Sequence, residues 1–272
     1  MGKIYLSIAG FNILCRMEES EQTYHRNRFL DMVEKDYGEF VVDKPKKVDF
    51  TMIINSTNMT SMEIRENTNN KNVKNHMVCL FHVDEKRHVL STHNPLGNFD
   101  LESIVNQVVY QYLLPHNKGF VLHGSSVRYK DKAFINEGRR GAGKSTTAQL
   151  LKGLCEVFSD DSIVVRKYKN RFYAYQPFFH EKNYNFERTN KDYKIEKIFF
   201  IRKSKKNYLE EIKNKNLILN KILKQVFTYP DGINIQFPLL TDFVNTADFY
   251  YLYVRKDEKE FKKFFKKEIL KV

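Results

Sequence analysis

Gly138-Arg139-Arg140-Gly141-Ala142-Gly143-Lys144-Ser145 is the stretch from which the fold of this 272-residue chain can be inferred. A glycine, four residues and then Gly-Lys-Ser form the pattern of a phosphate-binding loop, or P-loop. Glycines let the backbone curl so that its N–H groups surround a polyphosphate. Lys144 then contacts the β- and γ-phosphates, and the Ser145 hydroxyl is a ligand for Mg²⁺. The predicted nucleotide-binding residues are Gly138, Arg139, Arg140, Gly141, Ala142, Gly143, Lys144, Ser145 and Thr146.

The residues on either side of the loop have the patterns that a P-loop requires. Residues 133–135 (AFI) are typical of a short strand, and a helix is expected to begin at about Lys144. The positive end of that helix would face the phosphates. A strand, a loop and a helix in this order indicate an α/β fold. A flexible glycine loop is the alternative that the pattern alone leaves open.

The overall charge is strongly positive. Lys and Arg number 46 and Asp and Glu 33, so the formal net charge is +13. Such a charge suits phosphate-bearing partners, but the lysines are spread along the whole chain and asparagine is also abundant. Compositional drift toward Lys and Asn therefore explains the charge better than nucleic-acid binding, for which the sequence has no motif of interleaved aromatic and basic residues. No nucleic-acid partner is expected.

The cysteines and the apolar runs indicate a compartment. Cys15, Cys79 and Cys155 are widely spaced and form no CxxC pair, which argues against a disulfide framework or a structural zinc site. The apolar run at the start is too short for a signal peptide. No stretch approaches the roughly 18 apolar residues that a membrane span needs. We therefore expect a cytoplasmic protein with no membrane span.

Residues 1–95 are expected to form a β-rich N-terminal layer packed on a core that comprises residues 96–272. Strands in the layer are predicted at residues 3–8, 11–16, 48–55, 77–83 and 88–91. Residues 23–37 have helical spacing, and residues 56–75 are polar enough to form a solvated loop.

The core is predicted to alternate strands and helices. Its first helix can be capped by Asp100 and stopped by Pro115. Strands are predicted at residues 120–122, 125–129, 133–135, 155–158, 162–167, 171–175, 195–201 and 249–254. Further helices are predicted at residues 146–154, 208–227, 239–247 and 258–270. For the last helix, docking of its apolar face on the core is favoured over binding to a membrane or an acidic partner.

Two acids follow a short apolar strand beyond the loop. Asp160 and Asp161 follow residues 155–158 after one residue, Ser159. In a P-loop fold the strand after the loop's helix runs parallel to the strand before the loop, so both end at the same edge of the sheet. This geometry brings the aspartates to the metal, and a solvated turn is the alternative. His123 also follows an apolar strand, where a histidine is more often a structural hydrogen-bonding group than a catalytic one.

Three ordered motifs resemble one family of kinases. They are residues 122–127 (LHGSSV), residues 138–146 (GRRGAGKST) and residues 158–161 (FSDD). Their order and spacing resemble the HPr kinase/phosphorylase family, and more closely the shorter HPr-kinase-like proteins that include peptide serine kinases of lasso-peptide clusters. The similarity extends from about Phe99 to Val254. It implies a P-loop core like those of HPr kinase and phosphoenolpyruvate carboxykinase, with a mixed sheet and flanking helices.

The resemblance also implies roles for single residues. His123 looks like the active-site histidine, Asp160 like the general base and Lys144 like the lysine on the ATP phosphates. Asp161 and Ser145 would then lie near Mg²⁺, and Glu181 is a further candidate for the metal site. The implied reaction is transfer of the γ-phosphoryl group of Mg-ATP to a hydroxyl, a serine of a peptide or small protein. HPr kinases oligomerise, so the resemblance also implies a homo-oligomer.

Two departures from the family pattern leave a second function open. Arg139 and Arg140 replace the small residues that are usual inside this loop. The glycine-rich Arg-Gly-x-Gly segment of HPr kinases is missing, and its nearest counterpart, residues 196–200 (EKIFF), has no glycine. These differences argue against HPr itself as the substrate. A catalytically silent nucleotide-binding regulatory module of the same fold is therefore the alternative function.

Overall fold

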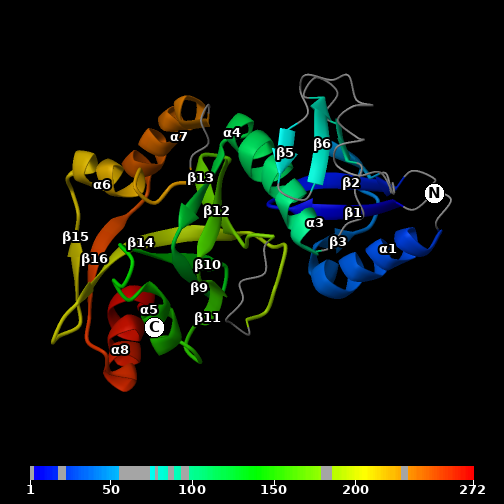
Figure 1. The fold of residues 1–272 in the computed structure, drawn as a ribbon. Coiled ribbons are helices and arrows are strands. Elements are labelled where there is room, and N and C mark those ends of the chain that lie inside the picture. The colour runs from blue at the N-terminus through cyan, green and yellow to red at the C-terminus, as the bar shows by residue number, and fades with distance from the viewer. Residues whose placement is uncertain are drawn as a thin grey trace. The chain divides into compact units, whose positions relative to one another are not determined.

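The structure, a computed structural model, divides into two compact units, Met1–Val109 and Tyr110–Val272 (Figure 1). It describes residues 3–17, 23–54, 74–76, 79–84, 89–92, 98–178, 186–227 and 232–272. The division falls later than the predicted boundary between residues 95 and 96. Helix α3 (Asn98–Val105) belongs to the first unit, where the Tyr37 hydroxyl donates a hydrogen bond to Glu102 Oε1 at 3.0 Å. Both units combine a sheet with helices, so the fold is mixed α/β.

In the described part of the first unit, seven strands form one mixed sheet. In spatial order its strands are β3 (Val41–Val42), β1 (Lys3–Ile8), β2 (Phe11–Met17), β4 (Phe50–Ile54), β7 (Val89–Thr92), β6 (Cys79–Asp84) and β5 (Lys74–His76). The β2–β4 and β4–β7 pairs are parallel and the other neighbours are antiparallel. The strands predicted at residues 3–8 and 11–16 form the antiparallel pair β1–β2, and those predicted at 77–83 and 88–91 correspond to the antiparallel pair β6–β7. The predicted helix is confirmed as α1 (Thr23–Tyr37), which a short helix η1 (Gly38–Phe40) follows. Apart from two residues in β5, the predicted loop at 56–75 lies outside the described residues.

The second unit is built on a nine-stranded sheet. The main path runs through β11 (Glu156–Ser159), β9 (Ser125–Tyr129), β10 (Lys132–Glu137), β14 (Tyr193–Lys203), β13 (Arg171–Tyr175), β12 (Ser162–Tyr168) and β8 (Gly119–His123). Strand β14 is long enough to pair with β13 through its first residues and with β16 (Phe249–Val254) through its last. Strand β15 (Tyr208–Glu211) completes the sheet beside β16.

Helices cover both faces of this sheet (Figure 1). Helices α6 (Lys215–Ile222) and α7 (Gly232–Thr246) pack on one face, against a core that includes Phe120, Ile198 and Phe249. Helix α5 (Lys144–Leu150) and helix α8 (Glu258–Phe264), which continues as η3 (Phe265–Leu270), pack on the other face. Phe261 and Phe265 of this last segment are fully buried, so the predicted docking on the core is confirmed. Among the described residues, no helix is both long enough and apolar enough to cross a membrane.

Three helix predictions differ from the structure. The helix predicted at residues 239–247 begins earlier, at Gly232 in α7, and contains Pro238. The helix predicted at residues 208–227 is interrupted, because Tyr208 to Glu211 form β15 and pair with β16. Tyr208 stacks on Tyr253 with ring centroids 4.0 Å apart, and Asn214 then caps the shorter α6 by accepting from the Leu217 amide.

The helix before β8 also departs from its predicted ends. It begins at Asn98 in α3, so Asp100 lies inside it and not at its cap. It continues through the π-helical segment η2 (Asn106–Leu113) into α4 (Leu114–His116). Pro115 lies inside α4, and the helix ends at His116, one residue after the proline that was expected to stop it.

The direction of the strands defines two edges of the second sheet. Strands β10, β14 and β16 are mutually parallel, and β11 is parallel to β10 because both are antiparallel to β9. All four strands therefore end at the same edge, which we call the loop edge because residues 138–143 follow β10 there. The edge at which they begin is called the opposite edge. The predicted parallel course of the strand before Asp160 is thus confirmed, although β9 lies between it and β10.

Candidate functional site

Residues 138–143 form a curled loop between β10 and α5. Gly138, Gly141 and Gly143 have φ angles of 152°, 78° and 103°, a region that residues with a Cβ rarely adopt. A Cβ on Gly138 would lie 2.8 Å from the Ala142 Cβ, closer than such atoms approach. The glycines therefore set the path of the loop.

Lys144 lies folded over the start of this loop. Its Nζ donates a hydrogen bond to the Gly138 carbonyl oxygen at 2.8 Å and lies 3.5 Å from His123 Nε2. Only 8% of the residue is exposed, and Gly143 precedes it at the N-cap of α5. The lysine charge is thus held at the first turn of a helix, where an anion is favoured.

His123 and the two aspartates meet at a sharp bend of the sheet. Strand β8 passes into β9 through Gly124, and β11 passes into β12 through Asp160 and Asp161. The Gly124 amide donates to the Asp161 carbonyl oxygen at 3.1 Å, which joins the two bends. His123 Nδ1 then lies 3.3 Å from Asp161 Oδ1, so the imidazole bridges Asp161 and Lys144.

The other predicted site residues are placed less closely. One carboxylate oxygen of Asp160 is buried at the bend, beside Asp161. Ser145 and Thr146 lie in the first turn of α5, and Arg139 and Arg140 are exposed on the loop. Glu181 lies outside the described residues. Within the described ranges, no group of three or more His, Cys, Asp and Glu side chains is placed to hold a metal ion.

Glu137 belongs to this site and was missed by the sequence analysis. It is the last residue of β10, directly before Gly138, and it is fully buried. Burial raises its pKa well above the ordinary value, and the charge of Lys144 and the nearby Gly138 N–H offset this only in part. No donor in the described part of the chain has hydrogen-bond geometry to either carboxylate oxygen. An acid between an apolar strand and a P-loop was the available signal.

Gly124 makes room for this acid. A Cβ at position 124 would lie 2.8 Å from Glu137 Oε1 and 2.9 Å from the Asn136 carbonyl oxygen. The glycine that follows His123 is therefore required by the close approach of β10, and the His-Gly pair of the sequence has a steric reason.

Comparisons with known proteins give one distant similarity. No family model matches the sequence, and no curated protein matches it. Among solved structures, the chain is similar to the HPr(Ser) kinase/phosphatase from Coxiella burnetii. The match has a TM-score of 0.33 and 9% sequence identity, and it covers 56% of this chain and 97% of that chain. At this level the comparison carries no argument about activity or about single residues.

Proposed function

We propose that the protein is a phosphotransferase that moves the γ-phosphoryl group of Mg-ATP to a hydroxyl, a serine of a peptide or protein. One observation carries the proposal. A glycine loop that needs its glycines, a buried lysine at its helix and a histidine paired with an aspartate lie within hydrogen-bond reach of one another. A binding loop needs no aspartate–histidine pair beside its lysine, whereas phosphoryl transfer needs acids and bases there.

The residues present suit ATP. The loop would place its backbone N–H groups around the β- and γ-phosphates, and Lys144 would exchange its contact with the Gly138 carbonyl for a phosphate oxygen. Glycine at position 138 is required by the path of the loop, because a Cβ there would lie 2.8 Å from the Ala142 Cβ. Asp161 and the Ser145 hydroxyl would hold Mg²⁺, which commonly takes only one or two protein ligands beside substrate phosphates.

The acids and the histidine would handle the proton. Asp160 would accept the proton of the acceptor hydroxyl. The hydroxyl oxygen of the acceptor then forms a bond to the γ-phosphorus, while the bond between that phosphorus and the β,γ-bridging oxygen breaks and ADP leaves. His123, held between Asp161 and Lys144, would orient both charges around the transferred group. The bound Mg²⁺ would neutralise charge that develops on the phosphate oxygens.

A direct assay tests this proposal. The full chain is incubated with γ-labelled ATP, with and without Mg²⁺, and with serine-containing peptides, while calorimetry measures nucleotide binding. We expect magnesium-dependent binding and labelled peptide, with nucleotide binding weakened by about 10- to 100-fold in Lys144→Ala. Absence of nucleotide binding in the wild-type protein would refute the proposal.

A second candidate is a regulatory module that binds the nucleotide without transferring phosphate. One observation favours this candidate: residues 196–200 lie inside β14, where most of them pair with β10 or β16. The segment therefore offers no loop that could act like the glycine-rich segment of HPr kinases. Tight ATP binding without labelled product across all acceptors would select this candidate.

A further inference from the structure

A pocket of about 340 Å³ opens beyond the ends of β14 and β16. Its walls come from three places in the chain. Lys205, Lys206 and Asn207 lie in the turn after β14, Arg255 follows β16, and α8 with η3 supplies the rest, including Lys263 and Phe264. We call this the basic pocket, and its volume is at the lower end of the range for ligand-binding clefts.

The charges that line the basic pocket are unbalanced. Five lining residues are cationic and two are acidic, which gives a net charge of +3. Two of the cations have acidic neighbours, since Arg255 lies 3.4 Å from Asp257 and Lys267 lies 3.3 Å from Glu268. Lys205, Lys206 and Lys263 form no ion pair with any carboxylate in the part of the chain that the structure describes.

The walls of the basic pocket are held in place without a ligand. The Arg255 amide donates to Asn207 Oδ1 at 2.7 Å, which joins the turn after β14 to the end of β16. Asp257 caps α8 by accepting from the Glu260 amide at 3.1 Å. Phe264 is half-buried between these walls and adds apolar surface. A cationic pocket with fixed walls and an apolar part suits a chain that carries carboxylates and aliphatic side-chain stems.

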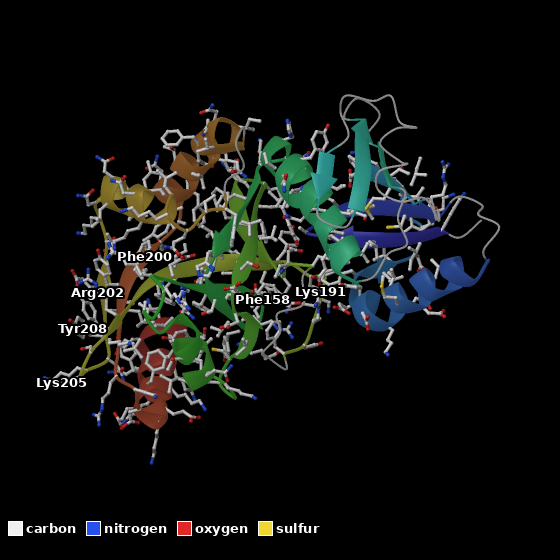
Figure 2. The ribbon with its side chains drawn as sticks, viewed as in Figure 1. Phe158, Lys191, Phe200, Arg202, Lys205 and Tyr208 are labelled. Atoms are coloured by element: carbon white, nitrogen blue, oxygen red, sulfur yellow. The ribbon has the colours of Figure 1, made fainter. Side chains whose placement is uncertain are left out.

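The basic pocket lies at the same edge as the candidate nucleotide loop. Strands β10, β14 and β16 are adjacent and parallel, so the loop after β10 and the residues after β16 are two strand spacings apart, about 10 Å. In Figure 2, Lys205 marks the turn of the pocket, and Lys191 lies at the far end of β14. A peptide of a few residues can span this separation, since an extended chain covers about 3.3 Å per residue.

We propose that the basic pocket binds an acidic peptide segment. This assignment of the ligand rests on the proposed function: the acidic segment belongs to the peptide that carries the acceptor hydroxyl. Arg139 and Arg140 then extend the cationic surface from the basic pocket toward the loop. Glu260 and Glu268 favour a peptide over a nucleic acid, because they can accept from peptide N–H groups and would repel a continuous phosphate backbone.

The test compares two pairs of charge reversals in the full-length protein. Lys205→Glu with Lys263→Glu changes the basic pocket, and Lys191→Glu with Lys213→Glu makes the same change in net charge at exposed positions of the opposite edge. The probes are a fluorescent glutamate-rich peptide with one serine, its glutamine counterpart and a single-stranded DNA of similar length. We expect the pocket pair to weaken binding of the acidic peptide at least about tenfold, and the control pair to change it less than about twofold.

Three results would overturn the proposal. They are equal losses in the two pairs, equal affinity for the glutamine peptide, and tighter binding of the DNA than of the acidic peptide at the same salt concentration. Nucleotide binding is measured in parallel, so that the two proposals fail separately. Lys144→Ala is expected to lose the nucleotide and keep the peptide, whereas the pocket pair is expected to keep the nucleotide and lose the peptide.

Discussion

The two edges of the second sheet share the same strands but differ in charge. At the opposite edge, lysines alternate with acids, as in Lys130-Asp131 and Lys191-Asp192, and Asp248 precedes β16. At the loop edge, β11 is followed by Asp160 and Asp161, whereas the residues that follow the other three parallel strands are mainly cations, namely Arg139, Arg140, Lys205, Lys206, Arg255 and Lys256. The overall charge of +13 is thus unevenly placed around this sheet. An edge with an excess of cations over acids is suited to anionic ligands.

The edges differ in their buried polar groups as well. Ser126 Oγ, Asn136 Oδ1 and both carboxylate oxygens of Glu137 are buried without a partner among the described residues, and all lie where β9 and β10 meet the loop edge. Each such group costs about 1–3 kcal/mol of stability. The buried polar groups at the loop edge therefore lower the free energy of unfolding, as is typical of functional sites.

The largest effect is expected from Asp160→Asn at the loop edge. If Asp160 is the base, the amide cannot accept the hydroxyl proton, and transfer from labelled ATP should fall about 10²- to 10⁴-fold while nucleotide affinity is kept. The matched control is Asp192→Asn, an identical change at an exposed aspartate of the opposite edge, which should leave transfer unchanged. Full transfer by the Asp160 variant would show that Asp160 is not the base. It would also show that the two edges do not differ in function in this respect.

A smaller loss is expected from Lys144→Ala, measured as nucleotide binding. Loss of a charged donor to the phosphates should weaken ATP binding by about 10- to 100-fold, which corresponds to about 1.5–3 kcal/mol. Lys194→Ala is the control, because Lys194 lies near the opposite edge, where it contacts Glu196 at 3.5 Å. Equal affinities of the Lys144 variant and the wild type would show that the loop does not bind the phosphates through this lysine.

The elements that were predicted correctly depend on neighbouring residues. The loop between β10 and α5 follows from its glycines, which determine backbone conformation locally. The strands predicted at residues 162–167 and 171–175 leave a short gap between them, and there Lys169 and Asn170 take the positive φ angles of a tight hairpin. Such features need no knowledge of what packs against them, and so the sequence alone predicts them.

The elements that were missed depend on distant residues. Leu209 and Ile212 fit a helical pattern with the residues that follow, but Leu209 pairs with Leu252 of β16 and so joins the sheet. Glu137 was not included in the strand predicted at residues 133–135, whereas β10 extends to Glu137 and carries it into the interior beside Gly124. Neither outcome is visible without the neighbouring strands.

Glu137→Gln tests whether the buried acid at the loop edge lowers the stability of the folded protein. Because burial raises the pKa of Glu137, the folded protein keeps a proton that the unfolded chain releases above about pH 4.5, and the wild-type protein loses stability as pH rises. Glutamine has the shape of the protonated acid and does not ionise. The variant should therefore gain stability relative to the wild type by up to about 1.4 kcal/mol per pH unit until Glu137 ionises in the folded state. Urea unfolding between about pH 5 and pH 8 measures this, and parallel pH profiles would contradict it.

The smallest effect is expected from Lys132→Met at the opposite edge. Lys132 Nζ lies 2.9 Å from Glu196 Oε1, and although burial pushes the pKa of Glu196 upward, the hydrogen bond and charge of Lys132 hold it below the ordinary value. A lowered carboxyl pKa stabilises the fold above the ordinary pKa, and that contribution disappears as pH falls. Both side chains are partly exposed and Lys194 also contacts Glu196, so the variant should lose less than about 1 kcal/mol near neutral pH and nothing measurable in acid. A loss that persisted in acid would mean that Lys132 stabilises this edge by packing and not by charge.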